Sequence, residues 1–91
     1  MKVYFVRFTR SAQKDLERLP ARIVERIQMA IRELANNPRP HGSIKLKGFD
    51  NRYRIRVGDY RVLDYRVLYE IHDAVVVVLI VQIAHRKDAY R

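Results

Sequence analysis

The sequence has 91 residues, 48% of them hydrophobic, with 19 Lys and Arg against 10 Asp and Glu and a formal net charge of +9. A chain of this length buries one modest core, so residues 1–91 are expected to form a single domain, and the charge favours nucleic acid, an acidic protein or an anionic membrane surface as partner. The absence of cysteine excludes disulfides and thiolate metal sites, and the three scattered histidines form no zinc motif. The sequence also has no carboxylate cluster to hold a metal and no glycine-rich phosphate loop, so neither a metal nor a cofactor is expected.

A short strand and two helices are predicted in the first half of the chain. Residues 3–8 are rich in aromatic residues and predict the strand, and Thr9 or Ser11 can cap a helix that ends before Pro20. Pro20 suits the first turn of a second helix, which ends where residues 36–38 break the pattern. Each helix has an apolar stripe at helical spacing, formed by Ala12, Leu16 and Leu19 in the first and by Ile23, Ile27, Ala30, Ile31 and Leu34 in the second.

The second half of the chain predicts strands. Residues 53–57 alternate between apolar or aromatic residues and arginine, so Arg54 and Arg56 point away from the core. Residues 69–84 predict a hairpin with its turn at residues 72–73. The expected fold is α+β, in the order β-α-α-β-β-β, with a two-helix hairpin packed on one face of a mostly antiparallel four-stranded sheet.

The apolar run at residues 74–84 predicts a buried strand rather than a membrane span. It is eleven residues long, whereas a helix that crosses a bilayer needs about 20. The N-terminus has an arginine within its short apolar run and no small-residue cleavage site, unlike a signal peptide. We therefore expect a cytoplasmic protein with no membrane association.

The word DYRVL occurs twice in succession, at residues 59–63 and 64–68, and the two copies allow two strand registers. A two-residue turn at residues 58–59 would bury three charged residues, Asp64, Arg66 and Glu70, at a cost of several kcal/mol each. The other register keeps charge off the core face; it pairs Val57 with Tyr65, Arg56 with Arg66, Ile55 with Val67, Arg54 with Leu68, Tyr53 with Tyr69 and Arg52 with Glu70. We therefore assign the second copy to the sheet and the first to the connection. A bulge within one long strand is the alternative.

The sheet face opposite the helices is expected to carry arginines. It collects Arg52, Arg54, Arg56 and Arg66, with Glu70 as its only acid and as the cross-strand partner of Arg52. Like charges at this density predict a bound anion, and the planar fork of arginine suits phosphate. The alternative is the ordinary solvated face of an antiparallel sheet.

Two residues near the C-terminus have two interpretations each. His85 can exchange a proton near neutral pH, or it can be a surface residue at a strand end. Tyr90 can stack on a base or orient a phosphate, or it can dock the tail on the core.

Three segments carry a family resemblance: KLKGFDNRYRIRVGDYRVL at residues 45–63, YEIHD at 69–73 and VVVVLIVQIAHRKDAYR at 75–91. Together they closely resemble the RelE branch of the RelE/ParE toxin superfamily, and the predicted element order agrees across essentially the whole chain. The resemblance implies a toxin that cleaves messenger RNA on the ribosome without a metal, by attack of a ribose 2′-hydroxyl on the adjacent phosphate. It also implies neutralisation by a cognate, RelB-like antitoxin.

The resemblance assigns site residues by position. A catalytic role is implied for Arg54, Arg56, Arg66, His85, Arg86 and Tyr90, and RNA binding is expected of Lys45, Lys47, Arg52, Arg61 and Lys87. The arginines would stabilise the charge of the phosphorane and His85 would protonate the leaving 5′-oxygen. No general base is obvious, with Glu70 or an arginine acting electrostatically as candidates. The family arginine after Gly-Asp-Tyr corresponds to Arg66 or Arg61, and the register favours Arg66.

The chain departs from the family in one respect: family members have the DYRVL word once and this chain has it twice. Two other functions stay open at this point. One is a ParE-type toxin, a non-enzymatic inhibitor of DNA gyrase on the same fold. The other is a toxin-like binding domain disabled by the duplication. For each function, an acidic partner is expected to cover the arginine face or the apolar helical surface.

Overall fold

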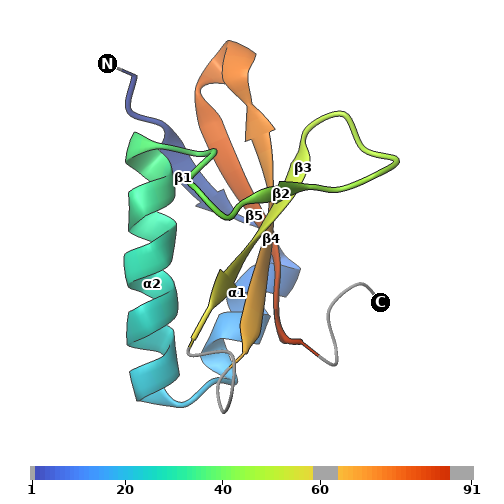
Figure 1. The fold of residues 1–91 in the computed structure, drawn as a ribbon. Coiled ribbons are helices and arrows are strands. Elements are labelled where there is room, and N and C mark those ends of the chain that lie inside the picture. The colour runs from blue at the N-terminus through green and yellow to red at the C-terminus, as the bar shows by residue number, and fades with distance from the viewer. Residues whose placement is uncertain (1, 59–63, 87–91) are drawn as a thin grey trace.

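The computed structural model describes residues 2–58 and 64–86, which form two helices and a five-stranded sheet (Figure 1). The elements are β1 (Phe5–Phe8), α1 (Arg10–Glu17), α2 (Ala21–Asn36), β2 (Ile44–Lys45), β3 (Arg52–Val57), β4 (Tyr65–His72), a 3₁₀ turn (Asp73–Val75) and β5 (Val77–His85). The strand order is β1-β5-β4-β3-β2, with β1 parallel to β5 and the other neighbours antiparallel. The predicted α+β class and helical hairpin are confirmed.

The expected count of four strands is wrong, because β2 adds a fifth at the edge of β3. Ile44 pairs with Arg54 and Lys45 with Tyr53. Two residues are too few to show the period-two pattern by which a strand is predicted. Pairing with β3, rather than a pattern in the local sequence, therefore holds residues 44–45 in an extended conformation.

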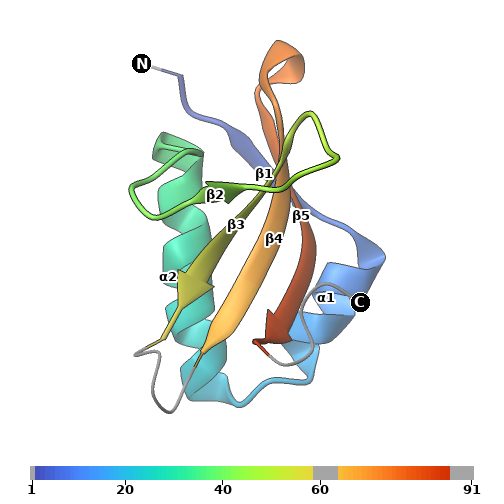
Figure 2. The ribbon, with the colours of Figure 1, turned by 45° about the vertical axis from the view of Figure 1, so that its right-hand side comes forward.

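Both helices bury their apolar stripes against one face of the sheet. Thr9 caps α1, its Oγ1 accepting a hydrogen bond from the backbone N–H of Ala12 at 3.0 Å. The core joins Ala12, Leu16, Ile23, Ile27, Ile31 and Leu34 to the sheet residues Ile55, Val57, Val67, Tyr69, Ile71, Val78, Ile80 and Ile83. Figure 2 shows β3, β4 and β5 side by side, with α2 running along the sheet. Among the described residues, no helix has the length and apolar character that crossing a bilayer requires.

The register of β3 on β4 is the one that keeps charges off the core face. Val57 pairs with Tyr65, Arg56 with Arg66 and Arg52 with Glu70, so the second copy of DYRVL lies in the sheet as predicted. The first copy, residues 59–63, lies outside the described part of the chain. The 3₁₀ turn delays β5 to Val77, three residues later than predicted.

Deleting residues 59–63 is expected to raise the free energy of unfolding by about 1 kcal/mol, since a shorter loop costs less entropy to close. The β3–β4 connection, residues 58–64, would shrink to Gly58 and Asp64 between the paired residues Val57 and Tyr65. Gly58 already has a positive φ of 124°, the sign that the first central residue of a type II′ turn requires. Urea denaturation would measure the change. Loss of a cooperative transition would show that the register depends on the first copy.

A bulge changes which side chains of β5 face the helices. Leu68 pairs with Gln82, but the next residue, Tyr69, pairs with Ile80, so Val81 is an extra residue in β5. The start of α1 covers this edge of β5 beyond the end of β1. The Thr9 hydroxyl donates to the Val81 carbonyl at 3.2 Å, and an Asp15 carboxylate oxygen accepts from the Ile83 N–H at 3.1 Å.

Candidate functional site

Four arginines gather at one end of the sheet face that lies opposite the helices. Alternation along β3 places Arg54 and Arg56 on this face, and Arg66 of β4 stands directly opposite Arg56. Arg86 follows β5, and its backbone N–H donates to the carbonyl of Asp64 at 2.8 Å. These four residues, called the arginine cluster below, confirm that the predicted strand register gives this face a concentrated positive charge.

A carboxylate that the sequence analysis did not place on this face lies inside the cluster. Asp64 is only 5% exposed. It accepts a hydrogen bond from Arg56 Nη2 at 3.0 Å, and Arg86 Nη1 lies 3.7 Å from the same oxygen. The expectation that Glu70 is the only acid on this face is therefore wrong. The predicted register could have revealed this acid. Alternation along β4, extended back by one residue from Tyr65, puts Asp64 on the same face as Arg66.

The electrostatics of Asp64 keep it charged at neutral pH. The hydrogen bond from Arg56 lowers the pKa of Asp64, opposed by desolvation and assisted by the charges of Arg56, Arg66 and Arg86. A buried carboxylate that accepts such a charge-assisted hydrogen bond fixes the orientation of the guanidinium group that donates it. Asp64 therefore organises the cluster while cancelling only part of its charge.

One guanidinium donor of the cluster is buried without an acceptor among the described residues. Arg54 Nη1 is buried and has no hydrogen-bond partner within residues 2–58 and 64–86. Leaving a buried charged donor without an acceptor is unfavourable, by about 1–3 kcal/mol or more. The Arg54 guanidinium would remove that penalty by turning toward a phosphate oxygen on this face, and arginine is the side chain best shaped to bind phosphate.

The other end of the same face is locally neutralised. Arg52 Nη2 lies 2.6 Å from Glu70 Oε2, which confirms the predicted cross-strand ion pair, and His72 Nε2 lies 2.9 Å from Glu70 Oε1. Arg52 and then His72 lower the pKa of Glu70 against the effect of burial. Leu68 separates Glu70 from Arg66 along this face of β4, so the candidate general base is not inside the arginine cluster.

The structure places His85 on the opposite side of the sheet from the arginine cluster. His85 pairs with Tyr65, whose side chain packs against the core, and the two rings meet edge to face with centroids 5.5 Å apart. The bulge at Val81 produces this arrangement, because it turns Ile83 and His85 toward the helices and leaves Arg86 on the arginine side. The described geometry therefore brings Arg86, and not His85, to the other arginines.

None of the remaining predicted RNA-binding residues that the structure describes belongs to the arginine cluster. By register, Lys45 shares the side of Tyr53, away from Arg54, and Lys47 is exposed in the β2–β3 connection. Arg61, Lys87 and Tyr90 fall outside the described residues, so their predicted roles stay predictions.

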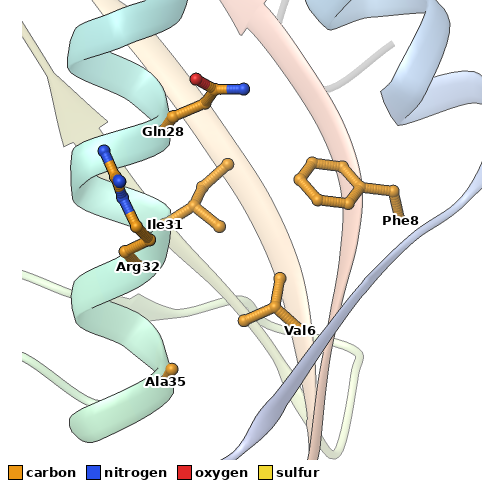
Figure 3. A pocket seen from close by; sticks show the side chains of 6 residues that line it. All are labelled: Val6, Phe8, Gln28, Ile31, Arg32 and Ala35. Atoms are coloured by element: carbon orange, nitrogen blue, oxygen red, sulfur yellow. The ribbon is translucent and has the colours of Figure 1, made fainter.

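A pocket lies on the helical side of the sheet. Figure 3 shows Val6, Phe8 and Ile31 pointing into the space between β1 and α2. The pocket has a volume of about 360 Å³ and is lined by Val6, Phe8, Gln28, Ile31, Arg32 and Ala35. None of these residues belongs to the arginine cluster. The chain thus offers an apolar surface and a basic surface on opposite faces of the sheet.

Comparisons with known proteins decide the family. A model of the family described as "ParE toxin of type II toxin-antitoxin system, parDE" matches residues 6–90. The chain is 35% identical to Toxin RelG of Mycobacterium tuberculosis over 89 residues, which cover 97% of each chain. The chain belongs to the RelE/ParE toxin superfamily, in its RelE branch. It is also 29% identical to the mRNA interferase toxin RelE of Escherichia coli K12, over 92% of this chain and 84% of that one.

The fold agrees with that of solved toxins of this superfamily. In the crystal structure of the intact Escherichia coli RelBE toxin–antitoxin complex, a chain matches this one with a TM-score of 0.78 and 28% identity. The match covers 90% of this chain and 95% of the other. The family model extends through the arginine cluster and on to residue 90. The resemblance expected from the sequence is therefore confirmed.

Proposed function

We propose that this chain cleaves messenger RNA on the ribosome and so blocks translation. The observation that carries the proposal is the arginine cluster, which combines four guanidinium groups with a buried Arg54 donor that lacks a partner among the described residues. A relative that is 29% identical over most of the chain is named an mRNA interferase. A reaction on the ribosome places the protein in the cytoplasm.

The chemistry that the cluster supports is attack of a ribose 2′-hydroxyl on the neighbouring phosphate. The bond from the 2′-oxygen to phosphorus forms while the bond to the 5′-oxygen breaks, and the leaving oxygen gains the proton that the 2′-hydroxyl loses overall. Negative charge grows on the non-bridging oxygens in between. Arg54, Arg56, Arg66 and Arg86 would stabilise that charge, and Asp64 would hold Arg56 and Arg86 in place before the substrate arrives.

Among the described residues, the only carboxylate inside the cluster is Asp64, which is buried and held by Arg56. His85 lies on the helical side of the sheet, and Glu70 is engaged with Arg52 and His72. Arginine stays protonated at neutral pH and acts as a donor rather than as a base. We therefore assign the contribution of the described residues to positioning and charge stabilisation. The catalytic role predicted for Tyr90 and the RNA-binding role predicted for Lys87 stay predictions, which mutation of each residue would test.

An antitoxin is the proposed protein partner. The solved Escherichia coli RelBE structure is titled a toxin–antitoxin complex, and this chain matches 95% of its toxin-like chain. The formal net charge of +9 favours an acidic segment in the antitoxin. Such a segment would compete with RNA for the arginine cluster, whereas the pocket between β1 and α2 offers apolar contacts.

A ParE-type inhibitor of DNA gyrase is the second candidate, because the matching family model carries the ParE description. Such an inhibitor has no need of four converging arginines around a clamped carboxylate. The geometry of the cluster therefore favours the RNA-cleaving function. A binding domain without activity is the third possibility, motivated by the repeated DYRVL word.

Purified protein added to a translation extract distinguishes these functions. We expect new 5′ ends within a translated message, no cleavage of the same message when ribosomes are removed, and suppression by the antitoxin encoded in the neighbouring reading frame. An Arg66→Ala preparation controls for contaminating nuclease. An intact message together with trapped gyrase–DNA complexes would instead establish the ParE-type function. An intact message with active gyrase would leave only the binding domain.

A further inference from the structure

A hollow lies beside the arginine cluster on the same face of the sheet. It has a volume of about 510 Å³ and is lined by Thr9, Ser11, Leu46, Phe49, Arg52, Leu68, Val81 and Gln82. Leu68 and Gln82 are paired neighbours in β4 and β5 and form its floor. Leu46 and Phe49, from the β2–β3 connection, form one wall. Thr9 and Ser11, from the start of α1, form the opposite wall.

The floor of this hollow includes one apolar residue, Leu68, although it belongs to the basic face. Leu68 is 5% exposed but is not a member of the core that joins the sheet to the helices. Polar side chains normally occupy the solvated face of an antiparallel sheet. Leu68, between Arg54 and Gln82, is covered by neighbouring side chains of its own chain, so the exposed apolar surface of the hollow belongs mainly to Phe49.

The wall of the hollow offers a stacking surface. Phe49 is 46% exposed, and the guanidinium carbon of Arg52 lies 4.3 Å from the centroid of its ring. Exposed aromatic rings and guanidinium planes are the groups on which proteins stack unpaired bases. The Gln82 amide adds two donors and an acceptor at the floor, which suits the hydrogen-bonding edge of a base.

The position of the hollow connects it to the phosphate site. Leu68 pairs with Arg54, and it is the next residue after Arg66 on this face of β4, at a spacing of about 7 Å. The hollow is therefore within reach of a nucleotide chain whose phosphate contacts Arg54 and Arg66. We propose that the hollow binds one nucleobase of the single-stranded RNA whose phosphate is held by the arginine cluster. This inference rests on the proposed function and adds to it a base-binding subsite formed by Phe49, Arg52, Leu68 and Gln82.

Binding of a non-cleavable RNA tests the subsite apart from the reaction. The probe is a labelled RNA hexanucleotide with 2′-O-methyl groups, which cannot attack the phosphate, and a matching set in which each base in turn is removed. Fluorescence anisotropy gives the affinities. We expect one abasic position to weaken binding to the unmodified protein by about tenfold, the usual size of a base–aromatic contact.

Phe49→Ala is expected to weaken binding of the intact probe by about tenfold and to abolish the penalty of that one abasic position, because both changes remove the same contact. Phe49→Tyr keeps the ring and should retain the affinity. Phe5→Ala is the matched control, since Phe5 is also exposed and has the Arg7 guanidinium over its ring at 5.8 Å, but it lies on β1 outside the hollow. Phe5→Ala should leave the affinity and the abasic penalty unchanged.

Three outcomes would overturn the inference: no abasic penalty at any position, an equal penalty in Phe49→Ala and the unmodified protein, or no binding of the intact probe. Cleavage in the translation extract separates the two proposals. If the message is cleaved there while the abasic penalties do not depend on Phe49, the subsite is wrong and the proposed function stands. If the message is not cleaved, the proposed function fails independently of the anisotropy result.

Discussion

Arg66→Ala is expected to reduce message cleavage in a translation extract by at least about 100-fold, because one lost donor to a developing charge costs roughly 2.7–4 kcal/mol. Arg66 stands opposite Arg56 in the β3–β4 register and on the same face as Asp64. Its guanidinium group is therefore held where it can reach the phosphate that the other arginines contact. Primer extension on the translated message measures the rate, and urea denaturation shows whether the variant is folded.

Arg61 provides the matched comparison for Arg66, because it occupies the same position in the first copy of the repeated word. Arg61→Ala should keep the cleavage rate and weaken ribosome binding as salt rises, since only a long-range attraction to RNA is lost. Arg56→Ala and Arg86→Ala should each lower cleavage by more than about tenfold. An inactive Arg61→Ala together with an active Arg66→Ala would show that the first copy supplies the active-site arginine.

Asp64→Asn is expected to bind RNA more tightly and yet to cleave it about tenfold more slowly. Binding improves because the variant removes a negative charge from the phosphate site. Cleavage slows because Arg56 and Arg86 lose the carboxylate that holds them, and misplaced catalytic groups lower rates by one to two orders of magnitude. Affinity for the 2′-O-methyl RNA and the cleavage rate measure the two effects separately.

Asp50→Asn is the control for Asp64→Asn, since it makes the same change of charge at an exposed position of the β2–β3 connection. It should leave the cleavage rate unchanged. An Asp64→Asn variant that gained affinity and kept its full cleavage rate would show that Asp64 does not position the arginines. Equal losses of affinity and cleavage would point to a damaged fold instead.

The stability of the unmodified protein relative to Asp64→Asn should also depend on pH in a defined direction. The folded-state pKa of Asp64 is lowered, chiefly by the Arg56 hydrogen bond, so the charged carboxylate stabilises the fold above its ordinary pKa of about 3.9. That contribution is lost as pH falls through the lowered value. The difference in free energy of unfolding between the unmodified protein and Asp64→Asn should be full at neutral pH and shrink below about pH 4. A difference that does not change with pH would contradict the ion pair.

The sequence alone determined the helices, the principal strands and the register that matters most for the site. Apolar residues at helical spacing and the breaks at residues 36–38 place α2, and strict alternation places β3. The duplicated word left two registers, and the cost of burying charge selected the one in which Arg56 meets Arg66. The sequence was sufficient to choose the β3–β4 register because the two registers differ in whether a set of charged side chains lies in water or in the core.

Tertiary structure decided which residues complete the cluster. The sequence of β5 alternates in a way that would place His85, rather than Arg86, on the face opposite the core, if the pattern set by Val78 and Ile80 continued. The extra residue at Val81 shifts that pattern by one, so Ile83 and His85 face the helices and Arg86 reaches Asp64. The bulge occurs where β1 ends and Thr9 and Asp15 of the α1 region take over the hydrogen bonds at the edge of β5. Those partners lie more than 60 residues away in the chain, and for that reason no local pattern in β5 could indicate the shift.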